Sequence, residues 1–378
     1  MSSNLSYWEK STFFNFDVVV IGSGIVGLNA AIHLKKALPL LKILVLERGF
    51  LPSGASTKNA GFACFGSISE LIEQEGICGT DGLMLLIEKR WKGLLKLRAL
   101  LGDEKLDYKQ YGGFELFTND DDALTEQCVS KIEHYNQLIS PIVGSQAFCI
   151  ANNKIDSFGF KNVKNLIYNQ YEAQIDTGKM MFNLIQLAQS LQIFILNNCE
   201  VAEIISDDNQ EIIITNQGRF YCKRVIVTTN AFVKSLLPGL DVEPGRGQVL
   251  ITKPIRNLKI EGTFHYDKGF YYFRNINDRV LLGGGRNLDF KTEETTAFGQ
   301  TAVVQKALET LLRQTILPDT HFEIDERWSG IMAFGKYLEP IITEAKPNVF
   351  CAARCNGMGI AMGSQTGTDA AELVMKSL

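Results

Sequence analysis

One stretch near the start of the chain, residues 17–47, constrains the fold more than any other. Its first residues, Asp17 to Ile21, form a β-branched run that is typical of a strand buried on both faces of a parallel sheet. Residues 28–38 then have the composition of a helix, and a second strand-like run, residues 42–46, ends at an acidic residue. Three glycines at G-x-G-x-x-G spacing separate the first strand from the helix: Gly22, Gly24 and Gly27. This order predicts a βαβ unit that binds a dinucleotide.

Each of the three glycines has its own role in such a unit. Gly22 permits a tight turn, Gly24 lets a pyrophosphate approach the backbone at the helix N-terminus, and Gly27 lets the helix pack closely on the strand. Glu47 follows the second strand, where its carboxylate can accept hydrogen bonds from a ribose hydroxyl. The same carboxylate would repel a 2′-phosphate, which argues against NADP. The alternative, a mere tight turn, is disfavoured because both strands, the helix and the acid are in place.

Composition limits the class of protein. The chain has 378 residues, of which 46% are hydrophobic and 21% charged, and this is ordinary for a soluble globular enzyme with two domains. The formal net charge is −4 and there is no long basic run, so we expect no nucleic-acid partner. The first sixteen residues lack a basic start followed by an apolar run, and no apolar stretch is long enough to span a bilayer. These features predict a cytoplasmic protein without a transmembrane segment.

The cysteines and histidines do not form a metal-binding pattern. The eight cysteines are scattered without a C-x-x-C pair, and there are only four histidines, so no zinc-like cluster is expected. Several cysteines lie in apolar runs, where a reduced thiol behaves as a small hydrophobe. A reducing compartment is the simplest interpretation. A redox pair of Cys351 and Cys355 is the alternative.

Two loops are rich in small residues. Residues 51–67 carry Gly, Ala and Ser that can offer backbone N–H groups to a ligand, and Phe62 and Phe65 argue against a flexible surface loop. Residues 354–360 form a second glycine turn before a closing helix at 363–376. Between the two loops, residues 68–101 have helical spacing of leucine and isoleucine, with a break at their glycines.

The rest of the chain alternates between two kinds of sequence. Buried strand-like runs at 224–230 and 348–353, and an antiparallel meander from 201 to 222, extend the nucleotide-binding domain. An aromatic alternating strand at 269–274 and a helix at about 296–314 indicate a second domain that covers the substrate. We expect the boundaries 15–80, 145–235 and 326–378 for the first domain, and 81–144 and 236–325 for the second.

Motifs along nearly the whole chain resemble the FAD-dependent amine and amino-acid oxidoreductases of the D-amino-acid oxidase superfamily. The nearest branch is the one typified by gamma-glutamylputrescine oxidase, with glycine and sarcosine oxidases more distant. The motifs are SYWE from Ser6, DVVVIGSGIVGLNAA from Asp17, SGASTKNAGF from Ser53, PGRGQVL from Pro244, VLLGGG from Val280, RWSGIMAF from Arg327 and NGMGIAMGSQTG from Asn356. The resemblance implies an α/β (α+β two-domain) fold. It would contain an FAD-binding Rossmann-like domain of the glutathione-reductase type and an inserted antiparallel-sheet substrate domain.

The resemblance also implies which residues hold the cofactor. Residues expected at the pyrophosphate are Gly22, Gly24, Ile25, Val26 and Gly27; Glu47 would hold the adenosine ribose with Arg48 beside it. Residues expected beside the pyrophosphate and the flavin ring are Gly54, Ala55, Ser56, Asn59, Ala60 and Gly61. The remaining expected cofactor residues are Val201, Thr229, Asn230, Gly330, Arg354, Asn356, Gly357, Met358, Gly359 and Ile360. Arg354 stands where the family often has a glycine. The loops that carry the flavin-linked cysteine or histidine in covalent members have neither residue here, so we expect non-covalent FAD.

The resemblance implies oxidation of a primary or secondary amine, or of an amino acid, to an imine by hydride transfer to flavin N5. Little general-base machinery is then needed, and the sequence offers no convincing catalytic dyad. Of the four histidines, only His265 is a candidate to line the site; the others are expected to be packing or surface residues: His33, His134 and His321.

A carboxylate on the substrate would call for an arginine that binds it bidentately. The candidates, in order, are Arg274, Arg354, Arg327, Arg286 and Arg246. Tyr271 and Tyr272 are expected on opposite faces of one strand. The hypothesis is that Tyr272, Arg274 and Arg354 orient a small amine or amino-acid substrate.

Three other functions are compatible with the sequence. One is an FAD-dependent dehydrogenase of a 2-hydroxy acid or a glycerol-phosphate-like substrate, and another is a protein that uses the flavin only structurally. A plain NAD-dependent dehydrogenase fits the C-terminal glycine turn poorly. Either oxygen or an electron carrier could reoxidise the flavin, because no motif decides between them.

Overall fold

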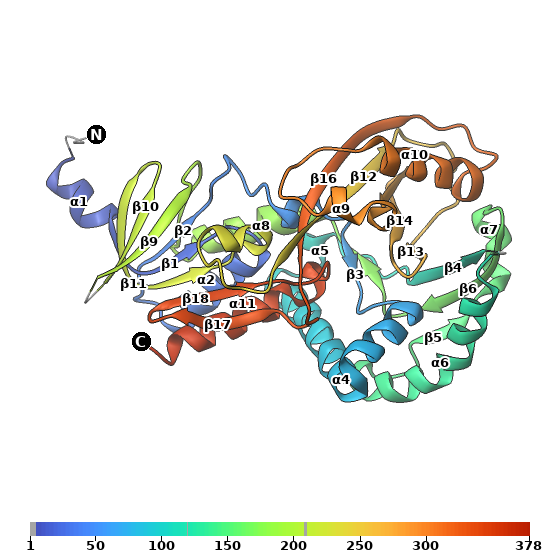
Figure 1. Ribbon diagram of the computed structural model, residues 1–378, viewed down its shortest axis with the longest axis horizontal. Coiled ribbons are helices and arrows are strands. Elements are labelled where there is room, and N and C mark those ends of the chain that lie inside the picture. The colour runs from blue at the N-terminus through green and yellow to red at the C-terminus, as the bar shows by residue number, and fades with distance from the viewer. Residues whose placement is uncertain (1–4, 119, 208–209) are drawn as a thin grey trace. The chain divides into compact units, whose positions relative to one another are not determined.

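The structure is a computed structural model that describes residues 5–118, 120–207 and 210–378 (Figure 1). The chain forms two compact units, each assembled from separate segments. The first unit comprises Met1–Thr57, Gly178–Glu243 and Ala333–Leu378, and the second comprises Lys58–Thr177 and Pro244–Met332.

The first unit is built on a largely parallel sheet in the order β17-β18-β11-β1-β2-β8, as expected for a dinucleotide-binding domain. Its strands β1, β2, β8, β11 and β18 pair in parallel, and β17 joins antiparallel at one edge. The hairpin β9–β10 extends from β11, which is one continuous strand where the sequence suggested a meander followed by a second strand. The bounds are β1 Asn15–Ile21, β2 Ile43–Leu46, β8 Phe194–Leu196, β9 Val201–Asp207, β10 Gln210–Thr215, β11 Gly218–Val227, β17 Ile341–Lys346 and β18 Val349–Ala353.

The helices of the first unit pack through small residues. A Cβ atom at Gly367 would lie 2.5 Å from the Val26 carbonyl oxygen, so only glycine lets α11 approach α2 this closely. The apolar side chains of α2 face this contact and the sheet, and most of them are fully buried. The helices are α1 Tyr7–Phe13, α2 Ile25–Ala37, α3 Ala55–Lys58, α8 Thr177–Ser190, the 3₁₀ turn η2 Asn230–Ser235 and α11 Gly359–Met375.

The second unit is built on an eight-stranded mixed sheet in the order β16-β12-β15-β14-β13-β4-β6-β5. The pairs are antiparallel from β12 to β13 and from β4 to β5, and β13 pairs with β4 in parallel. A separate two-stranded ribbon joins β3 to β7. The bounds are β3 Phe62–Ala63, β4 Gly113–Thr118, β5 Phe148–Ile150, β6 Val163–Asn169, β7 Ala173–Gln174, β12 Glu243–Thr252, β13 Thr263–Tyr266, β14 Tyr271–Ile276, β15 Arg279–Gly284 and β16 Ile324–Phe334.

The two faces of this sheet differ in chemistry. One face carries a stack of phenylalanines: the rings of Phe264 and Phe273 lie 4.6 Å apart, and those of Phe114 and Phe264 lie 5.2 Å apart. These rings belong to the main apolar core of the unit together with residues of α7 and α10. Because side chains alternate along a strand, the neighbouring residues Tyr272, Arg274 and His265 belong to the opposite face. The second face is therefore where polar chemistry concentrates.

Helices α4 and α6 pack against each other and enclose a second apolar cluster in this unit (Figure 1). The break predicted in α4 is present at Gly79, whose φ is 71°. The helix predicted at 296–314 begins later, at Ala302, and ends in a π-helical turn. The helical bounds are α4 Ile68–Leu101, α5 Asp103–Leu106, α6 Asp122–Val143, η1 Asn152–Lys154, α7 Ile155–Phe158, η3 Arg286–Leu288, α9 Phe290–Glu293, α10 Ala302–Leu311 and η4 Leu312–Ile316.

The compact units differ from the predicted domains in two long segments and two short ones, the short ones being residues 236–243, which belong to the first unit, and 326–332, which belong to the second. Residues 58–80 and 145–177 belong to the second unit, whereas the sequence placed them in the nucleotide-binding domain. The physical reason is long-range pairing. The first half of α4 packs on α6, and β5 and β6 extend the sheet from β4.

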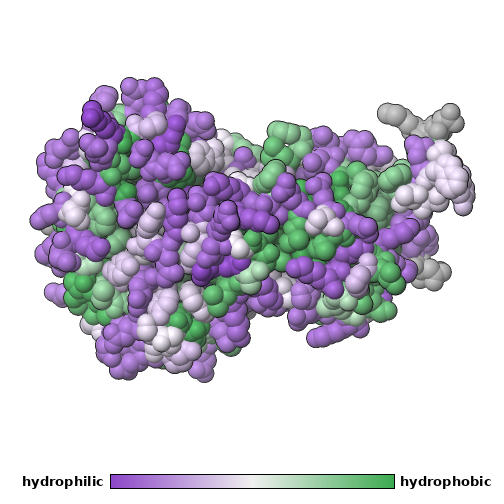
Figure 2. All heavy atoms as spheres, turned by 180° about the vertical axis from the view of Figure 1, so that it is seen from behind, coloured by the Kyte–Doolittle hydropathy of each residue, from purple (hydrophilic) through white to green (hydrophobic). Residues whose placement is uncertain are grey.

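The surface mixes polar and apolar side chains. Hydrophilic and hydrophobic residues are interspersed on the face drawn in Figure 2, and the hydrophobic ones form several separate groups. Across the described residues, none of the helices combines the length and the apolar character needed to cross a membrane. The eight cysteines, all of which are described, form no disulfide with one another.

Glu115 is a buried carboxyl group of β4 on the polar face of the sheet. Only 3% of it is exposed, and it accepts hydrogen bonds from the backbone N–H and the hydroxyl of Ser69 at the start of α4. Burial raises the pKa of Glu115 to about 7, although the bonds from Ser69 oppose the rise. The folded state therefore stabilises the protonated, uncharged form of Glu115.

The raised pKa of Glu115 predicts a loss of stability with rising pH. Its stabilising contribution is complete below the unfolded pKa of 4.5 and is lost as the pH rises through about 7. We expect Glu115→Gln, which mimics the protonated acid, to stabilise the protein relative to wild type at pH 8.5 but not at pH 4.5. The difference should be on the order of 3 kcal/mol at most. Thermal unfolding at both pH values measures it.

The exposed Glu126→Gln of α6 is the matched control and should show no such pH-dependent difference. A gap between Glu115→Gln and wild type that stays constant across this pH range would contradict the prediction.

Candidate active site

The glycine turn after β1 brings the start of α2 against the sheet. A Cβ atom at Gly27 would lie 2.0 Å from the Gly22 carbonyl oxygen and 2.5 Å from Thr228 Oγ1, so only glycine fits at position 27. The backbone N–H of Ile25 donates to Ser56 Oγ over 3.0 Å. The N-cap residue, Gly24, has no side chain to cap the helix, so the N–H groups that follow Ile25 in the first turn are open to an anion. The structure thus joins the two predicted pyrophosphate segments, which contain Gly22 to Gly27 and Gly54 to Ser56.

Glu47 ends β2 as a buried, oriented carboxylate. It accepts hydrogen bonds from the N–H and the hydroxyl of Ser23, at 3.2 and 2.7 Å, and from the Gly49 N–H at 3.0 Å. A carboxylate has about four acceptor positions, so one remains for a ribose hydroxyl. The neighbouring Arg48 guanidinium stacks on the Phe232 ring at 3.8 Å. These residues fit the predicted ribose site.

The carboxyl end of β11 supplies further polar groups. The Thr229 hydroxyl oxygen is buried and has no hydrogen-bond partner within the described chain, which leaves it free for a bound molecule. Asn230 has a positive φ of 49°, and its side chain accepts a hydrogen bond from the Arg354 N–H. Val201 begins β9 in the same unit.

The second glycine turn precedes α11. Positive φ angles at Arg354, Asn356 and Gly357, of 67°, 45° and 80°, turn the chain sharply before the helix begins at Gly359. Met358, the N-cap residue, provides no side-chain cap, so the first N–H groups of α11 are open to an electron-rich group. The backbone of residues 354–360 therefore has the form predicted for a cofactor contact.

The side chain of Arg354 makes its hydrogen bonds within the first unit. It is 4% exposed and donates to the Asp241 carboxylate and carbonyl, at 2.6 and 2.8 Å, and to the Glu339 carbonyl at 2.9 Å. A guanidinium held in this way ties two loops to the strand end and has little capacity left for a substrate. The geometry argues against Arg354 as a substrate-orienting residue.

This structural role of Arg354 can be tested by truncation. We expect Arg354→Met to lower the thermal unfolding midpoint, because it removes a buried partner of Asp241 and leaves two carbonyls without their donors. Substrate affinity per bound flavin should remain unchanged. The exposed Arg219→Met of the same unit is the control and should lower neither value. An unchanged midpoint with a raised KM would restore the substrate role.

Two further sets of predicted cofactor residues meet in the second unit. Asn59 Oδ1 accepts from the Gly61 N–H at 2.8 Å, which closes a local turn. Gly61 has a φ of 74°, and a Cβ atom there would lie 2.3 Å from the Ile175 carbonyl oxygen. On strand β16, the Trp328 indole donates to the Lys58 carbonyl at 2.9 Å. Ala60 and Gly330 lie within this arrangement: Ala60 is in one apolar cluster with Trp328, and a Cβ at Gly330 would meet Lys58.

Tyr272 and Arg274 share the polar face of the second sheet, as expected. Tyr271, on the other face, belongs to the phenylalanine core, whereas Tyr272 packs with Phe62 and Trp328. The Tyr272 ring lies where a side chain at Gly283 would be, because a Cβ atom there would come within 2.5 Å of it. Burial raises the pKa of the Tyr272 hydroxyl to about 12, so it stays protonated and able to donate.

Arg274 is a buried cation without a hydrogen-bonded acid. It is 5% exposed, its Nη1 donates weakly to the Gly61 carbonyl at 3.5 Å, and its Nε has no hydrogen-bond partner within the described residues. Burial lowers the pKa of Arg274 to about 10, and the charges of Asp176 and Asp107 partly oppose this. It therefore remains a cation at neutral pH with capacity to bind an anion.

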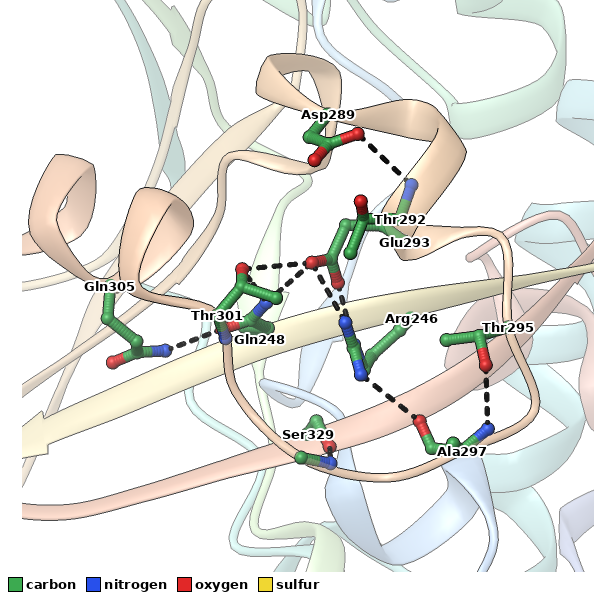
Figure 3. A network of polar contacts seen from close by, with 11 residues as sticks. Arg246, Gln248, Asp289, Thr292, Glu293, Thr295, Ala297, Thr301, Gln305 and Ser329 are labelled. Atoms are coloured by element: carbon green, nitrogen blue, oxygen red, sulfur yellow. Dashed lines mark hydrogen bonds and ion pairs between the residues drawn. The ribbon is translucent and has the colours of Figure 1, made fainter.

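The other candidate arginines are engaged elsewhere. Arg246 forms a two-point ion pair with Glu293, at 2.8 and 3.1 Å, inside the polar network of Figure 3. Burial acts to raise the pKa of Glu293, but hydrogen bonds from Arg246, Gln248 and Thr301 outweigh it and leave that pKa lowered. Arg327 pairs with Glu309, and the Arg286 guanidinium lies over the Phe290 ring.

Sequence reasoning missed several partners of these residues. It used Phe62 only to argue for an ordered loop, and it assigned no role to Trp328 or Met332, although both lie near Tyr272 or Gly247 in the structure. It also missed Glu172 and Glu70, the carboxylates beside His265. The glycines opposite Tyr272 were the available signal, because a small residue in a strand often leaves room for a large one.

The tight contact at Gly27 predicts the consequence of a single methyl group. We expect Gly27→Ala to push α2 away from β1 and to lower the bound flavin to below about a tenth of wild type. The measurement is the absorbance of flavin released by acid precipitation of the purified protein. It also tests whether the flavin is non-covalent, since released flavin stays in the supernatant.

Gly239→Ala is the matched control for Gly27→Ala, because a Cβ atom at Gly239 would meet nothing within 4 Å. Full flavin content in Gly27→Ala would show that the close contact is not needed for cofactor binding.

The profile of the family described as FAD dependent oxidoreductase (DAO) matches residues 17–373. The chain therefore belongs to this family and is an FAD-dependent oxidoreductase. The predicted family and the FAD cofactor are confirmed.

Individual relatives are distant. The glycine oxidase of Geobacillus kaustophilus is 23% identical, with 95% of this chain and 93% of that protein covered. Its crystal structure gives a TM-score of 0.76 over 96% of this chain and 95% of that one, at 19% identity, which supports the fold. The gamma-glutamylputrescine oxidoreductase of Escherichia coli is 23% identical, with 95% and 83% covered. A match to the bifunctional protein ThiO/ThiG of Synechocystis, 26% identical over 62% of this chain, spans only 32% of that protein.

Proposed function

We propose that this oxidoreductase oxidises the C–N bond of a primary or secondary amino acid to an imine, with non-covalently bound FAD. The observation that carries the proposal is Arg274, a buried guanidinium on the polar face of the second sheet whose Nε has no hydrogen-bond partner among the residues that the structure describes. The relatives named glycine oxidase and gamma-glutamylputrescine oxidoreductase support an amine or amino-acid substrate.

A carboxylate is the ligand that Arg274 fits best. Its planar guanidinium can donate two parallel hydrogen bonds to one carboxylate, and a buried cation gains the most from such a partner. Asp176 and Asp107 influence Arg274 only through their charges, without a direct hydrogen bond from its Nε. A substrate carboxylate would therefore complete the interactions of this side chain.

The groups around Arg274 would orient the rest of the substrate. Tyr272, two residues earlier on the same face, can donate from its protonated hydroxyl to the substrate carboxylate. Phe62 and Trp328 form an apolar wall with Tyr272 that excludes water from the bound substrate. Orientation of this kind suits a reaction that needs little acid–base assistance.

The first unit would hold the cofactor through the start of α2, Glu47, Thr229 and the turn before α11. When bound, FAD supplies the two-electron acceptor for the oxidation. The substrate α-carbon loses a hydride and its nitrogen a proton, which gives an imine that water hydrolyses. The loops that would carry a covalent link, SGIMAF and ASTKNAGF, contain neither cysteine nor histidine, which supports non-covalent binding.

A 2-hydroxy acid is the second candidate substrate, because Arg274 recognises a carboxylate and does not distinguish nitrogen from oxygen at the α-carbon. The products separate the two, since only amine oxidation releases ammonia or a shorter amine. Either oxygen or an electron carrier would then reoxidise the flavin.

The first experiment is anaerobic addition of amino acids, simple amines and 2-hydroxy acids to the flavin-loaded protein, followed by its visible spectrum. We expect the flavin bands to bleach with an amino acid. Arg274→Met should raise the KM for that amino acid about 10- to 100-fold, because a charge-assisted two-point bond is lost. Readmission of air then distinguishes an oxidase from a dehydrogenase.

The exposed Arg256→Met of the same unit is the control and should leave KM unchanged. An Arg274→Met enzyme with unchanged affinity for every accepted substrate would remove Arg274 from the proposal, and bleaching only by hydroxy acids would change the reaction class.

A further inference from the structure

His265 of β13 lies between two carboxylates in the interior of the second unit. Its Nε2 is 2.5 Å from Glu172 Oε1, and its Nδ1 is 3.5 Å from Glu70 Oε2. The histidine is 5% exposed and Glu172 is 1% exposed. Two other side chains complete its surroundings: the Cys64 thiol is within hydrogen-bonding reach, and the Phe62 ring meets the imidazole edge-on at 5.3 Å.

This geometry favours an imidazolium. A neutral imidazole carries one N–H, which the short contact with Glu172 would use, so the nitrogen that faces Glu70 would then direct a lone pair at that carboxylate. Burial alone would lower the pKa of His265, but the charge of Glu172, the bond with Cys64 and the charge of Glu70 outweigh it and raise that pKa well above its ordinary value. Glu115, the neighbour of His265 on β4, adds a further carboxyl group on this face.

The carboxylates are themselves held in place. The Ser67 N–H at the start of α4 donates to Glu70 at 2.9 Å, so the helix terminus orients this side chain. Glu172 occupies the space beside Gly113 of β4, where a Cβ atom would lie 2.3 Å from the Glu172 carboxyl carbon. The three charged groups therefore have fixed positions that do not depend on a ligand.

A metal ion would not fit this arrangement. Cys64, Glu172 and His265 offer ligand atoms within 4.8 Å of one another. However, two ligands about 2.0 Å from one tetrahedral zinc ion keep about 3.3 Å between them, and His265 Nε2 and Glu172 Oε1 are much closer. Burial also raises the pKa of the Cys64 thiol to about 11, which opposes the thiolate that a metal needs. A direct ion pair explains the geometry.

The ion pair between His265 and Glu172 adjoins the apolar wall that Phe62 and Trp328 form with Tyr272. Glu172 immediately precedes β7, whose residues pair with β3, so that Phe62 stands opposite Gln174. His265 stands opposite Tyr272 in the β13–β14 pair, and the Phe62 ring contacts both of them, at 5.3 and 5.8 Å. Gly61, one residue before β3, offers its carbonyl to Arg274. His265 thus connects β13, which pairs with the strand of Tyr272, to the segment that pairs with the strand of Phe62.

We propose that His265 is a positioning residue: as an imidazolium clamped between Glu172 and Glu70, it fixes β3 against β13 and so holds Phe62 on Tyr272 and the Gly61 carbonyl on Arg274. The kinetic part of this inference rests on the proposed function of Tyr272 and Arg274. The charge state of His265 does not.

The charge state can be measured directly in the flavin-loaded protein. The chain has four histidines, so ¹⁵N-histidine labelling gives a small set of ring signals, and the signal lost in His265→Gln belongs to His265. At pH 8.5, where an ordinary histidine is neutral, we expect both ring nitrogens of His265 to carry protons. A ring of His265 that is neutral at that pH would overturn the proposal.

The positioning role is tested by steady-state kinetics at full flavin occupancy. We expect His265→Gln to raise the KM for the accepted amino acid about tenfold or more, with a smaller change in kcat and unchanged flavin content. The single variant Glu172→Gln keeps His265 and an acceptor for its Nε2–H, so it should retain most of the wild-type affinity. His321→Gln is the matched control and should behave as wild type.

His265→Gln leaves the buried Glu172 carboxylate without its cation, so it could fail to fold. The double variant His265→Gln/Glu172→Gln removes the charges of one pair together and should also show the raised KM. An unchanged KM in a folded variant would overturn the positioning role. If Arg274→Met leaves KM unchanged as well, the proposed substrate site is wrong, whereas an effect of Arg274→Met alone rejects only the role of His265.

Discussion

The contact between α2 and β1 at Gly27 is the constraint on which the first unit depends. A methyl group there would come within 2.0 Å of the Gly22 carbonyl oxygen, so any larger residue would separate the helix from the strand. The same helix receives α11 on its other side through Gly367, again at a distance that excludes a side chain. Both helices begin after glycine turns, and neither N-cap residue supplies a side-chain cap. Small residues therefore determine where the N-termini of two helices can meet an anionic cofactor.

In the second unit, one face of the sheet is packed with apolar side chains and the other carries the charged and polar ones. The phenylalanine face supplies a large apolar area whose burial stabilises the sheet. The opposite face places Glu115, His265 and Arg274 in the interior, where an uncompensated charge costs several kcal/mol. His265 has two carboxylates beside it, and Glu115 is held by Ser69 and favours its protonated form. The fold compensates His265 and Glu115 locally, and the apolar face provides the stability that such an arrangement requires.

Local sequence patterns were sufficient for some features and insufficient for others. The first βαβ unit was predictable because its strand run, glycine spacing and terminal acid all lie within residues 17–47. The placement of residues 145–177 was not, since it depends on pairing between β4 and β6 across a long helix. Ribbon β3–β7 is too short to show alternation. The site residues follow the same rule. Tyr272 and Arg274 could be assigned to one face from strand periodicity, whereas the role of the Arg354 side chain depends on Asp241, 113 residues earlier in the chain.

The candidate arginines differ in their partners and not in their own chemistry. Arg246 and Arg327 each bind a glutamate, and Arg354 binds an aspartate and backbone carbonyls, so the fold itself satisfies these cations. Arg274 is as deeply buried as Arg354 but has only a weak bond to the Gly61 carbonyl and an Nε with no partner among the described residues. A stability argument alone would not retain such a group, because a buried cation without a hydrogen-bonded acid lowers the stability of the folded state. A carboxylate that arrives with the substrate would remove this deficit at the moment of binding, and the free energy so gained would favour substrates that carry one.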